Sequence, residues 1–345
     1  MSPVMPPTLS RRALLRAGGL AGLATVLAGC EGDDRPDSSS PTSTVEPDDP
    51  TTWPPDTTLL LAARQRVHGY LAALDVVDVP RGRRSRLAAV WGGQLDTLEQ
   101  LVSLGGVPLP EPPSDPVVSA APDDATRTTA PGDDADRTTG TGDDSDRTGG
   151  PARPPADQLG QVLRGDVSDA VRDASTATPA HLPMLVSLAA QHAAAAQELG
   201  APVDWPPMAG PRDAAAVPLL AALRPAVFGL EVLAARSRGE ERADYEGVLE
   251  PLAGLTRQLT SLAGRAAPVP PLGYDLPEPL GDAQDRRALA RRLVGDVAPA
   301  ALTTATRVAG DVTELTGVAR VVAEAVGWDR RLGGQGVPFP GMTTP

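Results

Sequence analysis

Apolar residues recur at helical spacing in eight separate segments of this 345-residue chain. Side chains three and four residues apart share one face of an α-helix, so each segment predicts an amphipathic helix. Only nine residues are aromatic (four Trp, three Tyr and two Phe), and a core of Leu, Val and Ala favours close-packed helices. We therefore expect an all-α fold, with helices over about 58–75, 83–104, 157–174, 179–199, 213–237, 241–264, 283–308 and 311–328. Prolines should end or kink some of these helices; the candidates are Pro183, Pro218, Pro225, Pro251 and Pro299.

The eight segments read as a set of four that occurs twice. LEQLVSLGG at 98–106 aligns with TRQLTSLAG at 256–264, an offset of 158 residues. In the latter halves, Gly165-Asp166-Val167 aligns with Gly295-Asp296-Val297, an offset of 130. The alternative is a chance alignment of helices that are all rich in Ala and Leu.

The repeat predicts two four-helix bundles in tandem, over 58–200 and 212–332, followed by a C-terminal tail at 333–345. In each bundle a long connection joins the second and third helices. A four-helix bundle with one long crossover is the ferritin-like arrangement.

The two offsets differ by 28 residues, and the 28 residues at 123–150 account for the difference. They lie between the second and third helices of the first unit and repeat Asp-Asp and Arg-Thr every ten residues. A calcium β-roll needs an apolar residue in each repeat, and this stretch has no Val, Leu or aromatic residue. We therefore expect residues 111–156 to be a disordered acidic insert that acts as a spacer.

The N-terminus resembles an export signal. Arg11 and Arg12 precede a weakly apolar run of 13 residues, and the following Leu27-Ala28-Gly29-Cys30 resembles a bacterial lipobox. Paired arginines before such a run are typical of twin-arginine export, and the run is shorter than the roughly 20 residues that span a bilayer. We predict that residues 1–29 are cleaved and that acyl chains on Cys30, palmitate among them, hold the protein on the extracytoplasmic face of the cell membrane. Residues 30–57 would be a disordered tether; the alternative is an ordinary secretory signal with an incidental cysteine.

Most of the acidic charge falls in these two linkers. The formal net charge is −13, while residues 31–58 hold eight acids and one Arg and residues 111–157 hold eleven acids and four Arg. The helical parts are thus nearly neutral and carry no basic stripe, which argues against nucleic-acid binding. Cys30 is the only cysteine, and the chain has no G-x-S-x-G elbow and no phosphate-binding glycine loop. Common nucleophilic and nucleotide-dependent enzymes are therefore disfavoured.

Residues 212–342 resemble a family of actinobacterial ferritin-like domains of unknown function. The resemblance rests on LLAALRPAVFGLEVLAA at 219–235, on VPPLGYDLPEPLGDAQDRRALARRL at 269–293, on Trp328 and on the closing Phe339-Pro340-Gly341. It implies a ferritin-like bundle whose metal ligands have degenerated, because the positions that are polar in the family hold Leu223, Arg224, Phe228, Leu230 and Val294.

Only the first unit contains histidines that could hold a metal. A di-iron bundle uses Glu from two helices and Glu-x-x-His from the other two, and the second unit has no His. Gln65-x-x-His68 and Gln191-His192 resemble such motifs, but each has Gln in place of the Glu that would supply the carboxylate. His68 and His192 are therefore the candidate ligands of a reduced site, with iron as the possible metal, although a lone helical His is more often structural. The helical acids of the second unit are expected on solvated faces: Glu231, Glu246, Glu250, Glu314 and Glu324.

These observations give one main hypothesis and two alternatives. The main hypothesis is a membrane-anchored extracytoplasmic lipoprotein whose degenerate bundles form a non-catalytic binding or scaffold module without a cofactor. The first alternative is a metal-handling or di-iron-type protein that uses His68 and His192. The second is a bundle whose Ala-rich interior binds a lipid or another apolar ligand. Apart from the membrane, the expected partner is an unidentified protein or apolar ligand.

Overall fold

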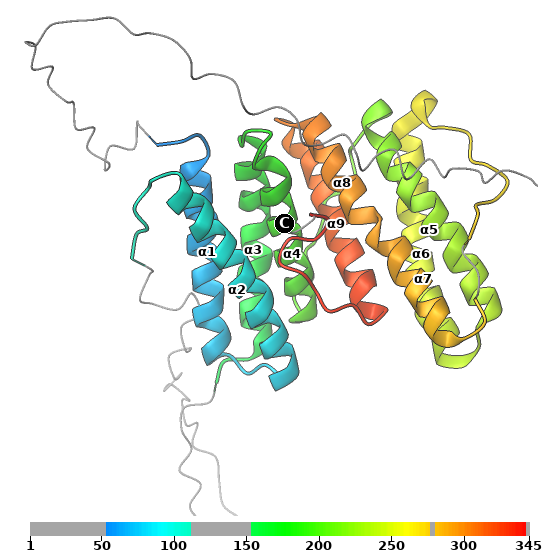
Figure 1. Ribbon diagram of the computed structural model, residues 1–345, viewed down its shortest axis with the longest axis horizontal. Helices are drawn as coiled ribbons and strands as arrows, with labels where there is room; N and C mark the ends of the chain where they lie inside the picture. The colour runs from blue at the N-terminus through cyan, green and yellow to red at the C-terminus, as the bar shows by residue number, and fades with distance from the viewer. Residues whose placement is uncertain (1–52, 112–152, 277–279, 343–345) are drawn as a thin grey trace, which may run out of the picture. The chain divides into compact units, whose positions relative to one another are not determined.

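The computed structural model describes residues 53–111, 153–276 and 280–342, and within them the regular structure is helical (Figure 1). The expected all-α fold is confirmed for this part of the chain, where one isolated β-bridge joins Asp78 and Pro155. Arg11, Arg12, Cys30, the tether and most of the acidic insert lie outside the described residues. The α-helices are α1 (Thr57–Val76), α2 (Arg81–Leu104), α3 (Ala156–Ser175), α4 (Leu182–Glu198), α5 (Val217–Arg236), α6 (Gly239–Ala263), α7 (Ala283–Gly295), α8 (Val297–Ala305) and α9 (Val312–Arg331).

The expected seventh helix is in fact two helices, so the prediction of one continuous element over 283–308 was wrong. Pro299 has no N–H, and within a continuous helix its ring would clash with the carbonyl of Gly295, four residues earlier. The chain therefore ends α7 at Gly295 and places Pro299 in the first turn of α8, where the missing N–H costs little. In α3 the aligned position is Asp169, and α3 runs unbroken.

The remaining prolines have milder effects. Pro183 and Pro218 occupy the first turns of α4 and α5, where helices tolerate proline well. Pro225 and Pro251 lie inside α5 and α6 without ending them. Within the described part of the chain, residues 213–236 alone form a helix long and apolar enough to cross a membrane, with 44% of the apolar window buried inside the protein. The packing of α5 against α6, α7 and α8 gives that apolar character a structural reason.

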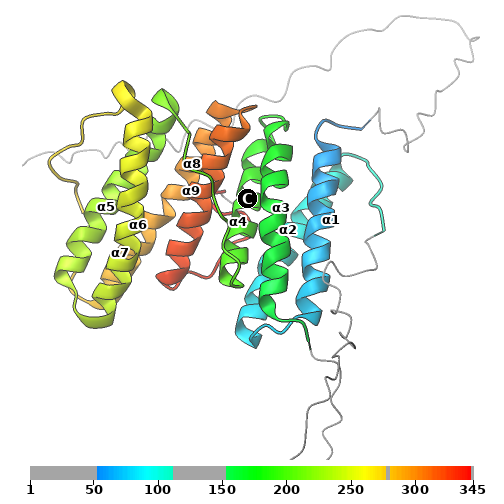
Figure 2. The ribbon, with the colours of Figure 1, turned by 180° about the vertical axis from the view of Figure 1, so that it is seen from behind.

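The described helices belong to one compact unit, in which an N-terminal half (α1–α4) packs against a C-terminal half (α5–α9). The two halves meet where α4 lies beside α9, as both views show (Figures 1 and 2). In α4, 14 of the 17 residues are buried, because helices cover it on several sides. Its run of alanines removes side-chain bulk and lets the neighbouring helices approach closely.

The segment after α9 packs back onto the N-terminal half. The Gln94 side-chain amide donates to the carbonyl of Pro338 at 2.7 Å, and the Ser187 hydroxyl donates to the carbonyl of Pro340 at 2.8 Å. Phe339, the residue between Pro338 and Pro340, is buried. The segment that follows α9, up to residue 342, accordingly passes beside α4 (Figure 1). Residues 333–342 are therefore part of the packed structure.

An ion cluster also joins the halves, and we call Arg83, Arg86, Glu198 and Arg330 the Glu198 cluster. The Glu198 carboxylate at the end of α4 forms ion pairs with three arginines: Oε2 lies 2.8 Å from Nη1 of Arg330 of α9, Oε1 lies 3.5 Å from Nε of Arg83 of α2, and Oε1 also pairs with Arg86 of α2. The Glu198 side chain is only 6% exposed, and burial lowers the pKa of the Arg330 guanidinium. Three arginines thus share one buried carboxylate across three helices.

Candidate functional site

His68, the first candidate metal residue, belongs to a salt-bridged group on α1 and α2. Its Nε2 lies 3.3 Å from Oε1 of Glu99, and Nε of Arg64 donates to the same oxygen at 2.9 Å. Burial alone would raise the pKa of the Glu99 carboxyl, but the hydrogen bonds from Arg64 and His68 outweigh it and lower the pKa. Because Arg64 already neutralises this carboxylate, the site is unfavourable for a metal cation.

His192, the second candidate, lies in the core of the N-terminal half. Its Nε2 is 3.1 Å from Oε1 of Gln94, and its ring packs edge-on against Tyr70 with centroids 4.9 Å apart. Burial, with a smaller contribution from the charge of Arg66, lowers the pKa of His192 to about 3. The imidazole is therefore neutral near pH 7, and its Nε2–H donates to the Gln94 carbonyl oxygen.

Neutral groups complete the surroundings of His192. Oε1 of Gln191 accepts from Nε1 of Trp91 at 3.3 Å and from Nε2 of Gln94 at 3.5 Å. Nε2 of Gln94 also donates to the Pro338 carbonyl. We call Trp91, Gln94, Gln191, His192 and the Pro338 carbonyl the Gln94–His192 network. Because its members are uncharged and satisfy one another, it stabilises the core without attracting a cation.

The Asp166 carboxylate comes near this network through Tyr70, which packs against His192, but it already accepts a hydrogen bond from the Tyr70 hydroxyl. The Tyr70 hydroxyl donates to Oδ2 of Asp166 at 2.7 Å, and burial followed by the charge of Asp166 raises the pKa of Tyr70. Among residues 53–111, 153–276 and 280–342, no three His, Cys, Asp or Glu side chains are grouped to hold a metal ion. His68 and His192 thus belong to two different hydrogen-bonded groups.

In the C-terminal half, the positions that the sequence marked as lost metal ligands lie mainly in apolar surroundings. Leu223 and Val294 are buried in the hydrophobic core, and the Phe228 ring lies 5.6 Å from that of Tyr274. Glu231, Glu246 and Glu250 are exposed, as expected for solvated faces. Glu314 and Glu324 are only partly exposed, and of the two Glu324 departs from the expected solvated face, because burial raises the pKa of its carboxyl.

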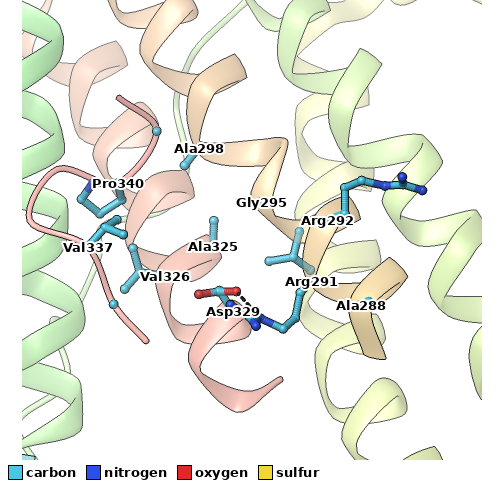
Figure 3. Close-up of a pocket in the computed structure, with 13 residues that line it drawn as sticks. Ala288, Arg291, Arg292, Gly295, Ala298, Ala325, Val326, Asp329, Val337 and Pro340 are labelled. Atoms are coloured by element: carbon cyan, nitrogen blue, oxygen red, sulfur yellow. Dashed lines mark hydrogen bonds and ion pairs between the residues drawn. The ribbon is translucent and has the colours of Figure 1, made fainter. Parts of the chain in front are cut away.

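A groove of about 480 Å³ lies among α7, α8, α9 and the C-terminal segment (Figure 3), and we call it the α7–α9 groove. Small and apolar side chains line most of it, among them Ala298, Ala325, Val326, Val337 and Pro340. At one edge Arg291 turns toward Asp329, with Nε 3.3 Å from Oδ1. The volume lies within the range of about 300–1,000 Å³ that is typical of small-molecule sites.

Sequence reasoning missed two components of the buried network. Gln94 comes three residues after Trp91 on a helix face that is otherwise apolar, and a polar residue there signals a buried hydrogen bond. The Pro338 carbonyl left no such signal, because a backbone group carries no side-chain identity.

No protein-family model, curated protein or solved structure matches this chain. The described residues therefore define a class at the level of architecture: an all-α protein with a neutral polar network in one half and an open apolar groove in the other.

Proposed function

We propose that this protein is a membrane-anchored extracytoplasmic lipoprotein whose two degenerate ferritin-like bundles act as a non-catalytic binding or scaffold module. The supporting observation is the Gln94–His192 network, which fills the centre of the N-terminal half with neutral amides and one neutral imidazole. Iron in a helical bundle is held mainly by carboxylates, since a hard cation prefers anionic oxygen.

The buried amides are poor substitutes for those carboxylates. The Oε1 atoms of Gln94 and Gln191 already accept hydrogen bonds, from His192 and from Trp91 and Gln94. A metal would have to break these bonds and would gain no negative charge. The core positions Leu223 and Val294 offer no ligand atoms at all.

Metal analysis tests the non-catalytic part of this proposal. We expect the purified mature protein to contain well under one iron per chain after iron loading and to show no ferroxidase activity. His192→Ala and His68→Ala should leave that iron content unchanged. About two irons per chain, as in di-iron bundles, with ferroxidase turnover would overturn the proposal in favour of the metal-handling alternative.

The anchoring part rests on Arg11, Arg12 and Cys30 in the sequence and has a separate test. Cys30→Ser should abolish incorporation of labelled palmitate and release the protein from washed membranes. Replacing Arg11 and Arg12 with lysine should keep the protein in the cytoplasm. Membrane retention of Cys30→Ser, or continued export of the lysine variant, would contradict lipidation or twin-arginine export respectively.

The α7–α9 groove favours a second candidate function, the binding of an apolar ligand. A fluorescent fatty acid serves as the probe. Val337 lines the groove and is 54% exposed, so Val337→Asp should lower the affinity for the probe without unfolding the protein. Leu272→Asp is the matched control, because Leu272 is fully exposed and does not line the groove. Equal affinities of the two variants would exclude the groove as the site.

A further inference from the structure

Arg320 and Glu324 are two charged side chains of α9 whose charges act on each other only through space, without a direct contact. Both are only partly exposed, yet neither forms a hydrogen bond or an ion pair with any residue in the described ranges. The Arg320 Nε atom is itself buried and unpaired. Partly burying a charge that has no hydrogen bond or ion pair costs free energy, so these residues need an explanation.

Another pair with the same spacing shows that this arrangement is unusual. Arg242 and Glu246 of α6 are also four residues apart, with the arginine first, and they pair at 2.6 Å between Nε and Oε1. Those side chains are about half exposed, where pairing contributes little. Arg320 and Glu324 are more buried and would gain more from pairing, yet they remain apart. Their surroundings therefore hold them in separate positions.

Both unpaired groups face the same small cavity. Arg320 and Glu324 line a space of about 230 Å³ between α6 and α9, which Leu255, Gln258 and Trp328 also line. Arg320 in addition lines a neighbouring space of about 280 Å³, whose apolar wall includes Trp205 and Met208. A cation and an anion thus share one cavity, and the cation lies at the border of a second, more apolar one.

We propose that these two cavities form a binding site for a free α-amino acid with an apolar side chain. Arg320 would bind its carboxylate, Glu324 would bind its ammonium group, and its side chain would enter the cavity beside Trp205 and Met208. The proposal does not depend on lipid anchoring or on the loss of a metal site. It assigns the protein a specific small-molecule ligand.

Charge and size both favour this class of ligand. Glu324 would repel a simple anion such as phosphate, and Arg320 would repel a metal ion, whereas a zwitterion satisfies both residues. Each cavity is smaller than the roughly 300 Å³ at which drug-sized sites begin, so neither space alone holds a nucleotide or a lipid, whereas an amino acid is small enough to place its charged groups in one space and its side chain in the other. Burial also raises the pKa of the Glu324 carboxyl, because its surroundings stabilise the negative charge poorly, and a bound ammonium group would stabilise that charge.

Calorimetric titration of the full mature chain with L-leucine tests the proposal. We expect saturable binding of leucine and none of acetate or methylammonium, each of which carries only one of the two charges. Arg320→Gln and Glu324→Gln should each weaken leucine binding at least about tenfold, because each removes a charge-assisted hydrogen bond. Arg242→Gln and Glu246→Gln are the matched controls and should bind leucine like the unaltered protein.

Two further ligands separate a free amino acid from a peptide terminus, and they use only the unaltered protein. N-acetyl-leucine lacks the ammonium charge and leucine amide lacks the carboxylate, so both should bind at least about tenfold more weakly than leucine. These measurements decide the question even where a variant fails to fold, which circular dichroism would reveal. Equal binding of leucine and N-acetyl-leucine, no leucine binding, or full leucine affinity in folded Arg320→Gln would overturn the proposal.

Discussion

The two halves of the molecule bury different kinds of side chain. Among the described residues, the polar residues that are buried as a whole, backbone included, are Thr57, Arg64, Gln94, Ser187, Gln191 and His192 in the N-terminal half and Ser237 and Thr304 in the C-terminal half. The N-terminal half satisfies Gln94 and Ser187 with carbonyls of the C-terminal segment. Similar helices can therefore enclose either a polar or an apolar centre, and the polar one depends on residues that come last in the chain.

The joint between the halves should give the largest effect on stability. Glu198→Ala would leave Arg330, together with Arg83 and Arg86, without its shared carboxylate. Removing one member of a buried ion pair typically costs about 3–5 kcal/mol, so urea unfolding should show a loss of that order. Glu246→Ala is the control, because its exposed pair with Arg242 should contribute less than about 1 kcal/mol. Similar losses in the two variants would show that the Glu198 cluster does not join the halves.

The acid dependence of the N-terminal half should give the next largest effect. Asp56 precedes α1, its side chain is 4% exposed, and its oxygens accept from the Thr178 backbone N–H at 3.0 Å and lie 2.9 Å from Nδ1 of His181. Burial would raise the pKa of Asp56, but these hydrogen bonds outweigh it and lower the pKa. The stabilisation is therefore present above the unfolded pKa of about 3.9 and is lost as the pH falls through the lower folded value.

Asp56→Asn should accordingly destabilise the protein by about 1.5–3 kcal/mol at pH 7 and by much less below pH 3. Asparagine suits this test because the backbone of Asp56 has a positive φ of 68°, which Asn tolerates better than most residues. Thermal unfolding between pH 2.5 and 7 measures the difference. A loss that is the same at every pH would mean that the charge of Asp56 is not what stabilises this corner.

Much of the fold could be predicted from the sequence, because helix periodicity is a local property. The expected helices match α1 to α6 and α9 to within a few residues, and only Pro299 broke the pattern that the apolar residues of 283–308 suggested. The contact between α4 and α9 could not be predicted in this way. The Ala-rich sequence of α4 indicates that other helices pack closely against it, but it does not indicate which helices these are.

The site was less predictable for a related reason. The sequence singled out His68 and His192 because of their residue type, but their partners decide their chemistry. Arg64 occupies the carboxylate beside His68, and Gln94 occupies Nε2 of His192. The sequence assigned Glu324 to a solvated face and did not single out Arg320, because many surface helices carry charges at that spacing and only burial distinguishes this pair.

The dependence of the polar centre on the C-terminal segment should give a moderate effect. Gln94→Leu leaves the Pro338 carbonyl and the His192 Nε2 without partners, which should cost about 1–3 kcal/mol in urea unfolding. Deleting residues 338–345 removes the same bond to Pro338. In a double-mutant cycle the combined loss should therefore be smaller than the sum of the two single losses.

Gln258→Leu, at an exposed position of the C-terminal half, is the control and should change stability by less than about 0.5 kcal/mol. Strict additivity would mean that the tail does not stabilise the network.

The smallest effect should have the opposite sign from that of Asp56→Asn. Burial raises the pKa of Glu324, while the charge of Arg320 only partly opposes it. A raised folded pKa means that the contribution of Glu324 to stability is fully present below its unfolded pKa of about 4.3 and is lost as the pH rises through the folded value. Glu324→Gln stays neutral at every pH. At pH 7 it should therefore unfold at a higher temperature than the unaltered protein, by an amount equivalent to about 0.5–1 kcal/mol, and near pH 4 the two should unfold at the same temperature.

A destabilised variant at pH 7 would show that Glu324 has a structural partner after all. A stabilised variant would mean that the negative charge of Glu324 destabilises the folded protein, as is expected of a charged group kept for ligand binding. The Gln94–His192 network of the N-terminal half is the opposite case, because its polar groups form hydrogen bonds with one another.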